Sequence, residues 1–397
     1  MLKPMSVTPG SVTPVPASSV PATSAIPRAT APIDDFYAIV PAGGAGTRLW
    51  PLSRQGAPKF LHDLTSTGRT LLQATMDRLA KVATDTVLVT GTKHVQACLA
   101  QLPGLADSNV LAEPSPRDSM AAIGLAAAVL QHRHGDVVVG SFAADQVMGD
   151  QMAFERAVTE AVAVARAGYV TTIGIAASRP STAFGYIHSA GELGVAGAPS
   201  ALKVVGFTEK PDAATAQAYV ASGEYRWNAG IFIAKTSVLL GHLATLQPEL
   251  YQGLTAIAQA WDSPRRQEVM AEVWPGLDKI AIDHAIAEPV AADGGVAVVP
   301  GTFAWDDIGD FNSLAALLPS VDARGNRVVG DATDLVTIEA AGNVVVPGSG
   351  RVVALLGVDD LVVVDTPDAL LVTTRSRAQQ VKDVVSAVRD GDHEDLI

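Results

Sequence analysis

Short apolar runs alternate with amphipathic or alanine-rich segments over the first three quarters of the chain. Each run is rich in Val and Ile and is bounded by Gly, Pro or polar residues. The runs predict strands at Tyr37–Ala42, Thr86–Thr90, Val137–Ala143, Val170–Ile175 and Gly230–Ala234. The segments between them predict helices, including Leu71–Ala83, Ser119–His132 and Phe154–Ala167. Because continuously apolar strands that alternate with helices are typical of a parallel sheet covered on both faces, we predict an α/β domain over residues 34–318.

The pattern changes after about Pro319. Short strand-like pieces recur about every 8–10 residues, with Gly, Asp or Asn between them and no helical segment. They lie at Val328–Val329, Leu335–Ile338, Val344–Val346, Val352–Leu356, Leu361–Val364 and Leu370–Val372. This spacing predicts a small all-β module over residues 319–397, either sandwich-like or a few turns of β-helix. Ser376–Asp390 would close it as a helix, with Val381, Val384, Val385 and Val388 on one face.

Residues 1–33 differ from the rest of the chain in composition. They contain seven of the 24 prolines and only two charged residues, Lys3 and Arg28. They have no continuous apolar stretch of the kind found in a secretory signal, so we expect a disordered Pro/Ser/Thr-rich tail. No apolar run reaches the ~18 residues of a membrane-spanning helix. We therefore expect a cytoplasmic protein without a membrane partner.

Charge narrows the choice of partners further. Lys and Arg number 28 against 41 Asp and Glu, for a net charge of −13. Binding of a nucleic acid polymer or an anionic lipid surface requires the opposite sign, so neither is expected as a partner. The single cysteine, Cys98, excludes an internal disulfide and a cysteine-based zinc cluster.

The strongest chemical motif follows the first predicted strand. We call the segment Gly43–Pro51, which reads Gly-Gly-Ala-Gly-Thr-Arg-Leu-Trp-Pro, the signature loop. Glycines at such a position let backbone N–H groups approach an anion. The loop lacks the Lys-Ser/Thr of a P-loop and the third glycine of the dinucleotide fingerprint. Arg48 and, after Pro58, Lys59 can hold phosphate oxygens as a fork and as a point charge.

This combination resembles the signature of the sugar-1-phosphate nucleotidyltransferases. Within that group, Leu-Trp-Pro-Leu-Ser-Arg at 49–54 and the step of eleven positions from Arg48 to Lys59 resemble the mannose-1-phosphate guanylyltransferases. The resemblance continues in order over roughly residues 36–390. It implies the nucleotide-diphospho-sugar transferase fold, an α/β fold with a Rossmann-like mixed, mostly parallel sheet and helices on both faces. It also implies a small C-terminal β-helix-like module.

The resemblance implies a nucleotide site built from two segments. The first is the signature loop with Lys59. The second is 113–119, Glu-Pro-Ser-Pro-Arg-Asp-Ser, which resembles the family's Glu-Pro-x-x-Arg-Asn-Thr beside the base but departs from it at its last two positions. The implied nucleotide-binding residues are Ala42, Gly43, Gly44, Gly46, Thr47, Arg48, Lys59, Glu113, Arg117, Asp118 and Ser119. The segment also suits a loop and helix start, since Ser119 opens an alanine-rich helix.

Two aspartates are the implied Mg²⁺ ligands. Asp145, in Ala-Ala-Asp-Gln, resembles the aspartate of the family's Pro-x-Asp-His, with Gln146 in place of the histidine. Asp307, in Trp-Asp-Asp-Ile-Gly, resembles the aspartate of Trp-x-Asp-Val-Gly. Either aspartate alone would also suit a turn or a helix cap. The carboxyl end of a central strand, where Asp145 is expected, is where ligands bind in open α/β sheets.

Four further segments resemble the family's sugar-phosphate site. They are Thr182–Ile187, with Ala183 in place of a glycine, Phe207–Pro211, Trp227–Phe232 and Ile282–Ala285. The implied sugar-phosphate-binding residues are Gly185, Tyr186, Glu209, Lys210, Asn228 and Asp283. For Asp283 a helix N-cap is an equally good reading.

The resemblance implies transfer of GMP from GTP to α-D-mannose 1-phosphate, with Arg48, Lys59 and Lys210 as the catalytic cations. The departures at Asp118, Gln146 and Ala183 leave another sugar 1-phosphate or another NTP open. A non-catalytic sugar-nucleotide sensor of the same fold is a second alternative. The chain lacks the His-x-His…Glu…His pattern of the isomerase domain that bifunctional members carry, so we expect no isomerase activity. Self-association into a homo-oligomer through the C-terminal module is compatible with either function.

Overall fold

The computed structural model describes residues 31–44, 46–391 and 393–397. Most of the predicted proline-rich tail therefore lies outside the described residues. Strand β1 (Ile33–Ala42) begins at Ile33, one residue before the expected start of the α/β domain and four before the predicted strand.

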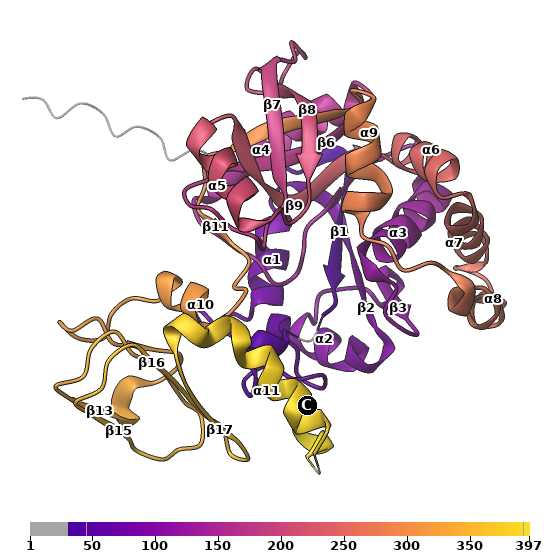
Figure 1. Ribbon diagram of the computed structural model, residues 1–397. Coiled ribbons are helices and arrows are strands. Elements are labelled where there is room, and N and C mark those ends of the chain that lie inside the picture. Colours follow the sequence, from indigo (N-terminus) through magenta and orange to yellow (C-terminus); the bar gives the residue numbers. More distant parts are fainter. Residues whose placement is uncertain (1–30, 45, 392) are drawn as a thin grey trace, which may run out of the picture. The chain divides into compact units, whose positions relative to one another are not determined.

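In the described part of the chain, nine strands form one sheet in the order β3-β2-β1-β4-β9-β6-β10-β8-β7 (Figure 1). Their bounds after β1 are β2 Ala83–Gly91, β3 Val110–Glu113, β4 Val138–Ser141, β6 Val170–Ala176, β7 Tyr186–Glu192, β8 Leu202–Thr208, β9 Tyr225–Lys235 and β10 Val296–Gly301. β1 pairs in parallel with β2 and β4, and β6 with β10. β9 lies antiparallel between β4 and β6, and β8 is antiparallel to β10 and β7. The mixed sheet expected from the resemblance is confirmed.

Helices cover both faces of this sheet, as the alternating pattern predicted. Neighbouring residues of a strand point to opposite faces. Ile39 of β1 packs in one hydrophobic cluster with α3, α6 and α7, whereas Ala38 and Val40 pack in a second cluster with α4. Figure 1 shows α3, α6, α7 and α8 grouped together beside the sheet. Helix bounds in this part are α1 Leu71–Leu79, α2 Val95–Gln101, α3 Asp118–His134, α4 Gln151–Arg166, α5 Ala213–Ser222, α6 Thr236–Leu246, α7 Pro248–Ala260, α8 Arg266–Val273 and α9 Glu288–Ala292.

Two predicted elements change length for clear reasons. The helix predicted over Leu71–Ala83 ends at Leu79, because Ala83 already starts β2. The strand predicted over Gly230–Ala234 extends over the eleven residues of β9, because pairing with β4, β6 and β7 occupies its whole length.

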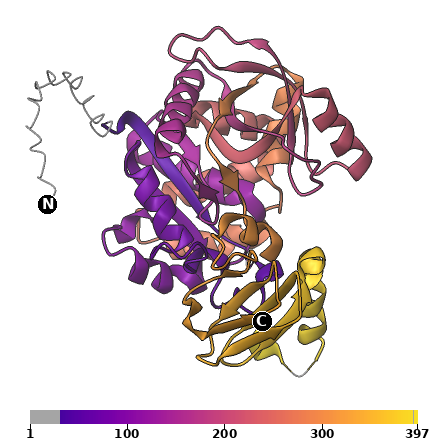
Figure 2. The ribbon, with the colours of Figure 1, turned by 90° about the vertical axis from the view of Figure 1, so that its left-hand side faces the viewer.

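The C-terminal module is a short β-helix, so the sandwich-like alternative is wrong. After α10 (Phe311–Leu317), alternate strands stack in parallel: β12-β14-β16 in one sheet and β13-β15 in another (Figure 2). Buried Asn326 and Asn343 stack at one corner, where the Asn343 Nδ2 donates to the Asn326 Oδ1 at 2.9 Å. The bounds are β12 Arg327–Val328, β13 Leu335–Ile338, β14 Val344–Pro347, β15 Val353–Leu356, β16 Leu361–Asp365 and β17 Leu370–Thr374.

The closing helix predicted over Ser376–Asp390 is present, but only its second part is α-helical. Its first turn is the 3-10 helix η8 (Arg375–Gln380), and α11 spans Val381–Arg389. Val381 and Val385 are buried in a cluster that also contains Leu49 and Trp50 of the signature loop. Val384, which was predicted on the same face, is exposed. The closing helix therefore packs on the α/β domain as well as on its own module.

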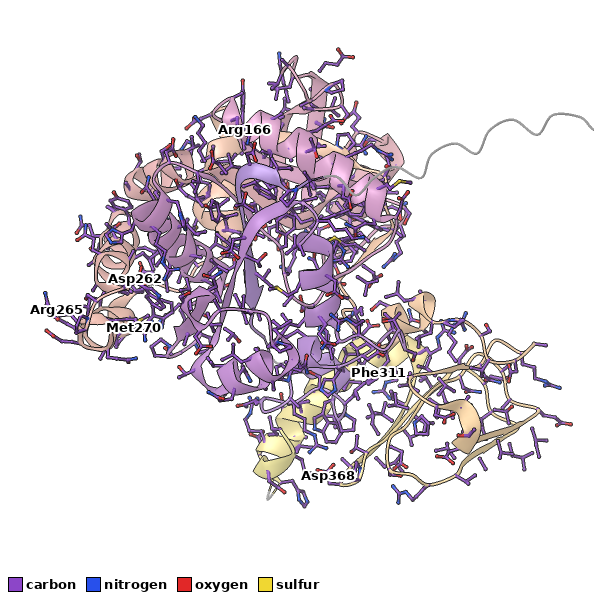
Figure 3. All side chains as sticks on the ribbon, turned by 180° about the vertical axis from the view of Figure 1, so that it is seen from behind. Arg166, Asp262, Arg265, Met270, Phe311 and Asp368 are labelled. Carbon is purple, nitrogen blue, oxygen red and sulfur yellow. The ribbon has the colours of Figure 1, made fainter. Side chains whose placement is uncertain are left out.

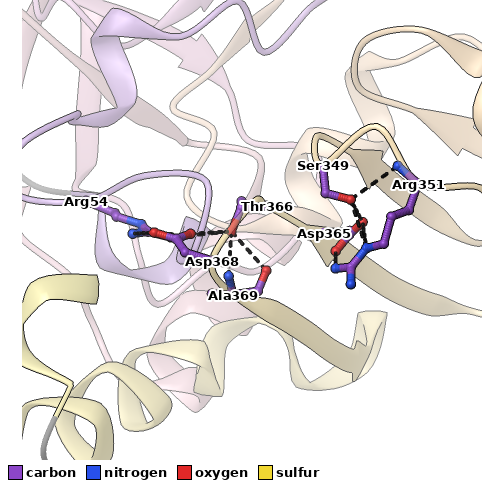
Figure 4. A network of polar contacts seen from close by, with 7 residues as sticks. All are labelled: Arg54, Ser349, Arg351, Asp365, Thr366, Asp368 and Ala369. Atoms are coloured by element: carbon purple, nitrogen blue, oxygen red, sulfur yellow. Dashed lines mark hydrogen bonds and ion pairs between the residues drawn. The ribbon is translucent and has the colours of Figure 1, made fainter.

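A salt bridge adds to this contact. Arg54, just after the signature loop, donates from Nη1 and Nη2 to the two carboxylate oxygens of Asp368 at 2.7 and 2.5 Å (Figure 4). Asp368 lies in the turn between β16 and β17. The C-terminal module is thus joined to the signature region by apolar packing and by a two-pronged ion pair.

None of the described helices is both long and apolar enough to cross a membrane. Cys98 is fully buried in α2, and this burial raises the pKa of its thiol to about 11.

Candidate active site

The signature loop turns sharply at two glycines. Gly44 and Gly46 have φ angles of +83° and +62°, in the left-handed region that residues with a Cβ rarely adopt. A Cβ on Gly46 would stand 2.9 Å from both the Lys59 Cβ and the Ser53 Oγ. A Cβ on Gly43 or Gly44 would meet no described atom within 4 Å. The loop therefore packs against Lys59 on one side and is open to a ligand on the other.

Lys59 is the central cation of the site. It begins the 3-10 helix η2 (Lys59–Leu61), and only 7% of the residue is exposed. Its Nζ lies 2.8 Å from the Asp145 Oδ2 and donates a hydrogen bond of 2.5 Å to the Asp307 carbonyl oxygen. One ammonium group thus bridges the two segments that contain the predicted metal ligands.

A small β-ribbon explains why these two aspartates meet. β5 (Val147–Met148) pairs antiparallel with β11 (Trp305–Asp306), with Asp306 opposite Val147. Asp145 precedes β5 and Asp307 follows β11. Antiparallel pairing therefore places the two aspartates at the same end of the ribbon.

Gln146 braces this ribbon against the main sheet. Its Nε2 donates to the Ala229 carbonyl oxygen of β9 at 3.0 Å, and its Oε1 accepts from the Trp305 Nε1 at 3.2 Å. The glutamine that replaces the family's histidine therefore has its own structural contacts on both sides.

Arg48 completes the cluster at the turn after β11. A Cβ on Gly309 would stand 3.3 Å from the Arg48 Nη1 and 3.4 Å from the Asp307 Oδ1. Ile308, which lies between Asp307 and Gly309 in the sequence, has a φ of +43°, which is unfavourable for a β-branched residue. Its N–H donates to the Asp306 Oδ1 at 2.7 Å, which helps to hold this conformation. Strained backbone of this kind is typical of functional turns.

We call Arg48, Lys59, Asp145 and Asp307 the signature cluster. Burial raises the pKa of the Asp307 carboxyl above its ordinary value, and the negative charges of Asp306 and Asp145 raise it further. The positive charges of Lys59 and Arg48 act in the opposite direction. Because two carboxylates repel each other here in a partly desolvated site, the cluster favours additional positive charge between them.

A cavity of about 480 Å³ unites residues from two predicted groups. We call it the Asp283 cavity. It is lined by Asp118 and Ser119, predicted for the nucleotide, and by Glu209, Lys210 and Asp283, predicted for the sugar phosphate; Lys279, Ile280, Ala281 and His284 complete its wall.

Asp283 is held in this cavity by Asn228. The Asn228 Nδ2 donates to the Asp283 Oδ1 at 3.0 Å, while the Asn228 Oδ1 accepts from the Thr172 Oγ1 at 2.8 Å. Burial raises the pKa of the Asp283 carboxyl to about 6, and the nearby charge of Glu209 adds to this effect. Asp283 begins a short π-helix, Asp283–Ala287, which is a helix type often found at functional sites.

The Glu209 and Lys210 side chains form an ion pair at the cavity. A Cβ on Gly185 would stand 2.5 Å from the Glu209 Oε2, so glycine lets this carboxylate keep its present position. Three predicted sugar-site residues do not line the cavity, namely Gly185, Tyr186 and Asn228. Tyr186 is fully buried in the core and its hydroxyl accepts from the Ser181 N–H at 2.8 Å, so the side chain does not line the cavity.

The predicted base loop contains one unsatisfied carboxylate. Glu113, at the end of β3, is buried, and its Oε1 has no hydrogen-bond partner among the described residues. Burial raises the pKa of this carboxyl to about 7. Arg117 instead donates to the Pro275 and Leu277 carbonyl oxygens at 2.5 and 2.7 Å. Both terminal nitrogens of the Arg117 guanidinium thus hold the loop in place and do not point to a ligand.

Asp118 and Ser119 join the start of α3 to the Asp283 segment. The Asp118 Oδ1 accepts from the Ser119 N–H at 2.8 Å, and the Ser119 Oγ accepts from the Ile282 N–H at 2.9 Å. Asp118 also adopts a left-handed φ of +65°. Asp118 and Ser119 therefore start helix α3 and also line the Asp283 cavity, so the two interpretations of this segment are compatible.

Sequence reasoning missed three polar residues at these sites. Lys279 and His284 line the Asp283 cavity, and the His284 Nδ1 lies 2.8 Å from the Glu288 Oε2. Their nearness to Asp283 in sequence was the available signal. Gln379 accepts a hydrogen bond of 3.2 Å from the Arg48 Nη1 across 331 positions of sequence, and no local pattern could have indicated it.

Comparison with known proteins agrees with this fold. A model of the nucleotidyl transferase family matches residues 37–323, and one of a mannose-phosphate isomerase/GMP-like β-helix domain matches residues 333–388. The chain therefore belongs to the nucleotidyl transferase family of enzymes.

The individual relatives narrow this class. The mannose-1-phosphate guanylyltransferase of Escherichia coli K12 is 37% identical over 371 residues, which cover 90% of this chain and 74% of the relative. The xanthan biosynthesis protein XanB of Xanthomonas campestris is 36% identical over 364 residues, with the same coverage. A crystal structure from Thermus thermophilus, described as a mannose-1-phosphate geranyltransferase, has a TM-score of 0.79 at 32% identity and covers 89% of this chain and 99% of its own. Within the nucleotidyltransferases, the chain is a member of the mannose-1-phosphate guanylyltransferase family.

Proposed function

We propose that the protein transfers GMP from GTP to α-D-mannose 1-phosphate and so forms GDP-mannose and pyrophosphate. One observation carries the proposal: the fold brings Arg48, Lys59, Asp145 and Asp307 together beside an open glycine loop. Two cations hold phosphate oxygens, and two carboxylates can hold a divalent cation. The names of the relatives supply the sugar and the nucleotide.

The proposed chemistry is a single displacement at phosphorus. A phosphate oxygen of mannose 1-phosphate forms a bond to the α-phosphorus of GTP. The bond from that phosphorus to the oxygen bridging to the β-phosphate breaks, and its electron pair leaves with pyrophosphate. Because the second pKa of a phosphate lies near ~6, the attacking oxygen is already ionised at neutral pH and needs no general base. The protein's task is to position two polyanions and to stabilise the charge between them.

The signature loop and its cations would hold the triphosphate. Backbone N–H groups of the loop would bind phosphate oxygens on the side where Gly43 and Gly44 leave space, together with Arg48 and Lys59. Lys210 would hold the phosphate of the sugar, with its ammonium in the Asp283 cavity. Glu209, Asn228 and Asp283 offer carboxylate and amide groups for the sugar hydroxyls.

The donor set of the signature cluster fits Mg²⁺. Asp145 and Asp307 provide hard oxygen ligands, and a cation would relieve their mutual repulsion. No group of three or more His, Cys, Asp or Glu among the described residues could hold a metal by itself. That arrangement suits an ion that takes its remaining ligands from water and substrate phosphates, as Mg²⁺ commonly does. When bound, Mg²⁺ would neutralise charge on the phosphate oxygens.

Glu113 supports guanine as the base. A buried carboxylate with a free oxygen accepts hydrogen bonds and donates none once ionised. The edge of guanine carries a ring N–H and an adjacent amino group, two donors that a carboxylate can receive together. Adenine presents no ring N–H on the corresponding edge, so the same carboxylate would select against it.

A pyrophosphate-release assay with five NTPs against several sugar 1-phosphates tests the proposal. We expect the fastest release with GTP and mannose 1-phosphate in the presence of Mg²⁺. Faster turnover of another pair would reassign the substrates. No release with any pair, together with nucleotide or sugar-nucleotide binding, would favour the non-catalytic sensor.

Cytoplasmic location and self-association are part of the same proposal. GTP and sugar phosphates are intracellular metabolites, and several large apolar side chains of the β-module are exposed, including Val352 and Leu356. Cell fractionation and sedimentation equilibrium test these two statements.

A further inference from the structure

The C-terminal module reaches the signature cluster through one side chain of η8. Gln379 accepts a hydrogen bond of 3.2 Å from the Arg48 Nη1 at its amide oxygen. Its amide nitrogen donates to the Asp310 Oδ2. Asp310 is 7% exposed, and its other oxygen caps α10 by accepting from the Asn312 and Ser313 N–H groups.

These contacts place Gln379 between two parts of the proposed site. Arg48 belongs to the signature loop, and Asp310 follows Asp307 by three residues in the strained turn after β11. The Arg48 guanidinium is already close to the Asp307 carboxylate at the Gly309 position. The amide therefore ties the cation to the turn that contains the proposed metal ligand.

The chemistry of this bridge requires a carboxamide. Arginine can only donate hydrogen bonds and an ionised aspartate can only accept them. A glutamine side chain accepts at its oxygen and donates at its nitrogen, so it satisfies both partners at once. A glutamate at this position would place a second negative charge next to Asp310. A lysine would place a second positive charge next to Arg48.

Burial does not hold Gln379, since the residue is exposed, but its neighbours are anchored. Ala378 and Val381 flank it and are 1% and 2% exposed, in a hydrophobic cluster shared with Leu49 and Phe311. The backbone of η8 is thus fixed to the signature loop, and the amide extends from a defined position.

We infer that Gln379 is a positioning residue that holds Arg48 in place for the triphosphate of the nucleotide, so that the C-terminal module is a working part of the nucleotide site. This inference rests on the proposed function and adds a residue to it. A free arginine side chain samples many rotamers and loses that freedom when it binds phosphate. Fixing Arg48 beforehand removes part of this cost and so increases affinity for the nucleotide.

Gln379→Met tests the inference, because methionine has a similar length and makes neither hydrogen bond. We expect the KM for GTP to rise by about 5- to 10-fold, as for loss of one typical hydrogen bond, while the KM for mannose 1-phosphate stays unchanged. Turnover at saturating GTP should stay within about twofold of the native value, because the chemical step uses the same groups. Lys382→Ala, an exposed change in α11, is the matched control and should leave both KM values unchanged.

A rescue experiment separates positioning from a general effect on folding. Gln379→Glu should also raise the KM for GTP, because its carboxylate repels Asp310. Adding Asp310→Asn to that variant allows the bridge to form with the hydrogen bond reversed, and asparagine still caps a helix. We expect the double variant to recover most of the native KM. A KM for GTP that does not change in Gln379→Met, or a double variant no better than Gln379→Glu, overturns the inference.

Failure of the inference about Gln379 can be distinguished from failure of the proposed function. If the native protein releases no pyrophosphate in the substrate panel, the proposed function fails. Calorimetric dissociation constants for GTP in native protein and Gln379→Met then test the inference alone. Equal constants, or no GTP binding by native protein, overturn it. A lowered melting temperature with an unchanged KM also overturns it, since that result describes a structural contact.

Discussion

Asp365 in the C-terminal module is buried and Asp307 in the signature cluster is half-buried, and their surroundings shift the pKa values of the two carboxyl groups in opposite directions. Asp365 is 2% exposed and accepts hydrogen bonds from Ser349 and from Arg351, whose Nε lies 3.2 Å away (Figure 4). These contacts lower its pKa despite burial. Burial raises the pKa of Asp307, and the described residues donate no hydrogen bond to its carboxylate.

The difference shows how one residue type serves two purposes. The Asp365 carboxylate has its partners within its own module, so its charge is balanced before any ligand arrives. The Asp307 carboxylate has no such partner among the described residues and lies near other carboxylates, so its charge costs free energy in the folded state that a bound cation would reduce. The contrast leads us to propose a role in stability for Asp365 and a role in function for Asp307.

The largest expected effect comes from Asp307→Asn. Removing the charge takes away one of the two proposed metal ligands, so turnover should fall by about 100-fold or more. The melting temperature should stay the same or rise, since a half-buried charge is lost. Pyrophosphate release at saturating Mg²⁺ measures this, and chelation of Mg²⁺ should abolish native turnover. Near-normal release by the variant would contradict the metal assignment, and Asp365→Asn is the matched control with native turnover.

Arg48→Ala is expected to have the next largest effect. Loss of charge-assisted hydrogen bonds to phosphate should raise the KM for GTP by about 10- to 100-fold. Steady-state kinetics with varied GTP measures it. Arg265→Ala is a suitable control, because Arg265 pairs with Glu268 at 3.3 Å and lies far from Asp368 in Figure 3. Equal kinetics for the two variants would refute the role of Arg48.

Arg389 would be an unsuitable control for that experiment, although it is exposed on the closing helix. It lines a cavity of about 270 Å³ together with Gly44 and Thr47 of the signature loop. Because Arg389 lies beside the signature loop, Arg389→Ala could itself lower activity and would not serve as a distant control.

Glu113→Gln extends the contrast to a third carboxyl. The pKa of Glu113 is raised to about 7, so folding favours the protonated form. Its contribution to stability is complete below about pH 4.5 and is lost as the pH rises through 7. The native melting temperature should fall relative to the variant over this window, by an amount equivalent to about 1–3 kcal/mol. A constant difference in melting temperature between native protein and Glu113→Gln at all pH values would contradict the raised pKa of this carboxyl.

Asp365→Asn should have the smallest effect of the series. Replacing the charged acceptor weakens its bonds to Ser349 and Arg351 and should lower the free energy of unfolding by about 1 kcal/mol. Because the folded-state pKa is lowered, the native advantage is present above about pH 4 and disappears as the pH falls further. Chemical denaturation at pH 7 and pH 3 measures it. A large loss of turnover in a variant with native stability would contradict the contrast between the two aspartates.

Much of the fold was predictable because it follows from local periodicity. Strand β1 alternates between two cores, and the helices α3 and α4 arise from continuous apolar or amphipathic patterns. Strand direction was less accessible. β9 is apolar like its neighbours but runs antiparallel to them, and periodicity contains no information about direction. The division of the closing helix into a 3-10 part and an α-helical part was also missed, because the two helix types have similar patterns over six residues.

The candidate site divides in the same way. The motifs named most of the chemistry-bearing residues, including Asp118 and Glu209 in the Asp283 cavity. They could not show that Tyr186 is fully buried or that Arg117 spends two donors on carbonyl groups. Exposure and hydrogen bonding depend on which segments pack nearby, and those segments are distant in sequence.

The sequence by itself determined which groups are available: a glycine loop, two cations, two aspartates and a β-module with a closing helix. Their residue types and local spacing suffice for that, because backbone freedom, charge and periodicity are local properties. Only the tertiary structure decided that Lys59 joins Asp145 to the Asp307 backbone and that Gln379 joins Arg48 to Asp310. Such contacts depend on long-range strand pairing and packing, which bring together side chains from opposite ends of the chain.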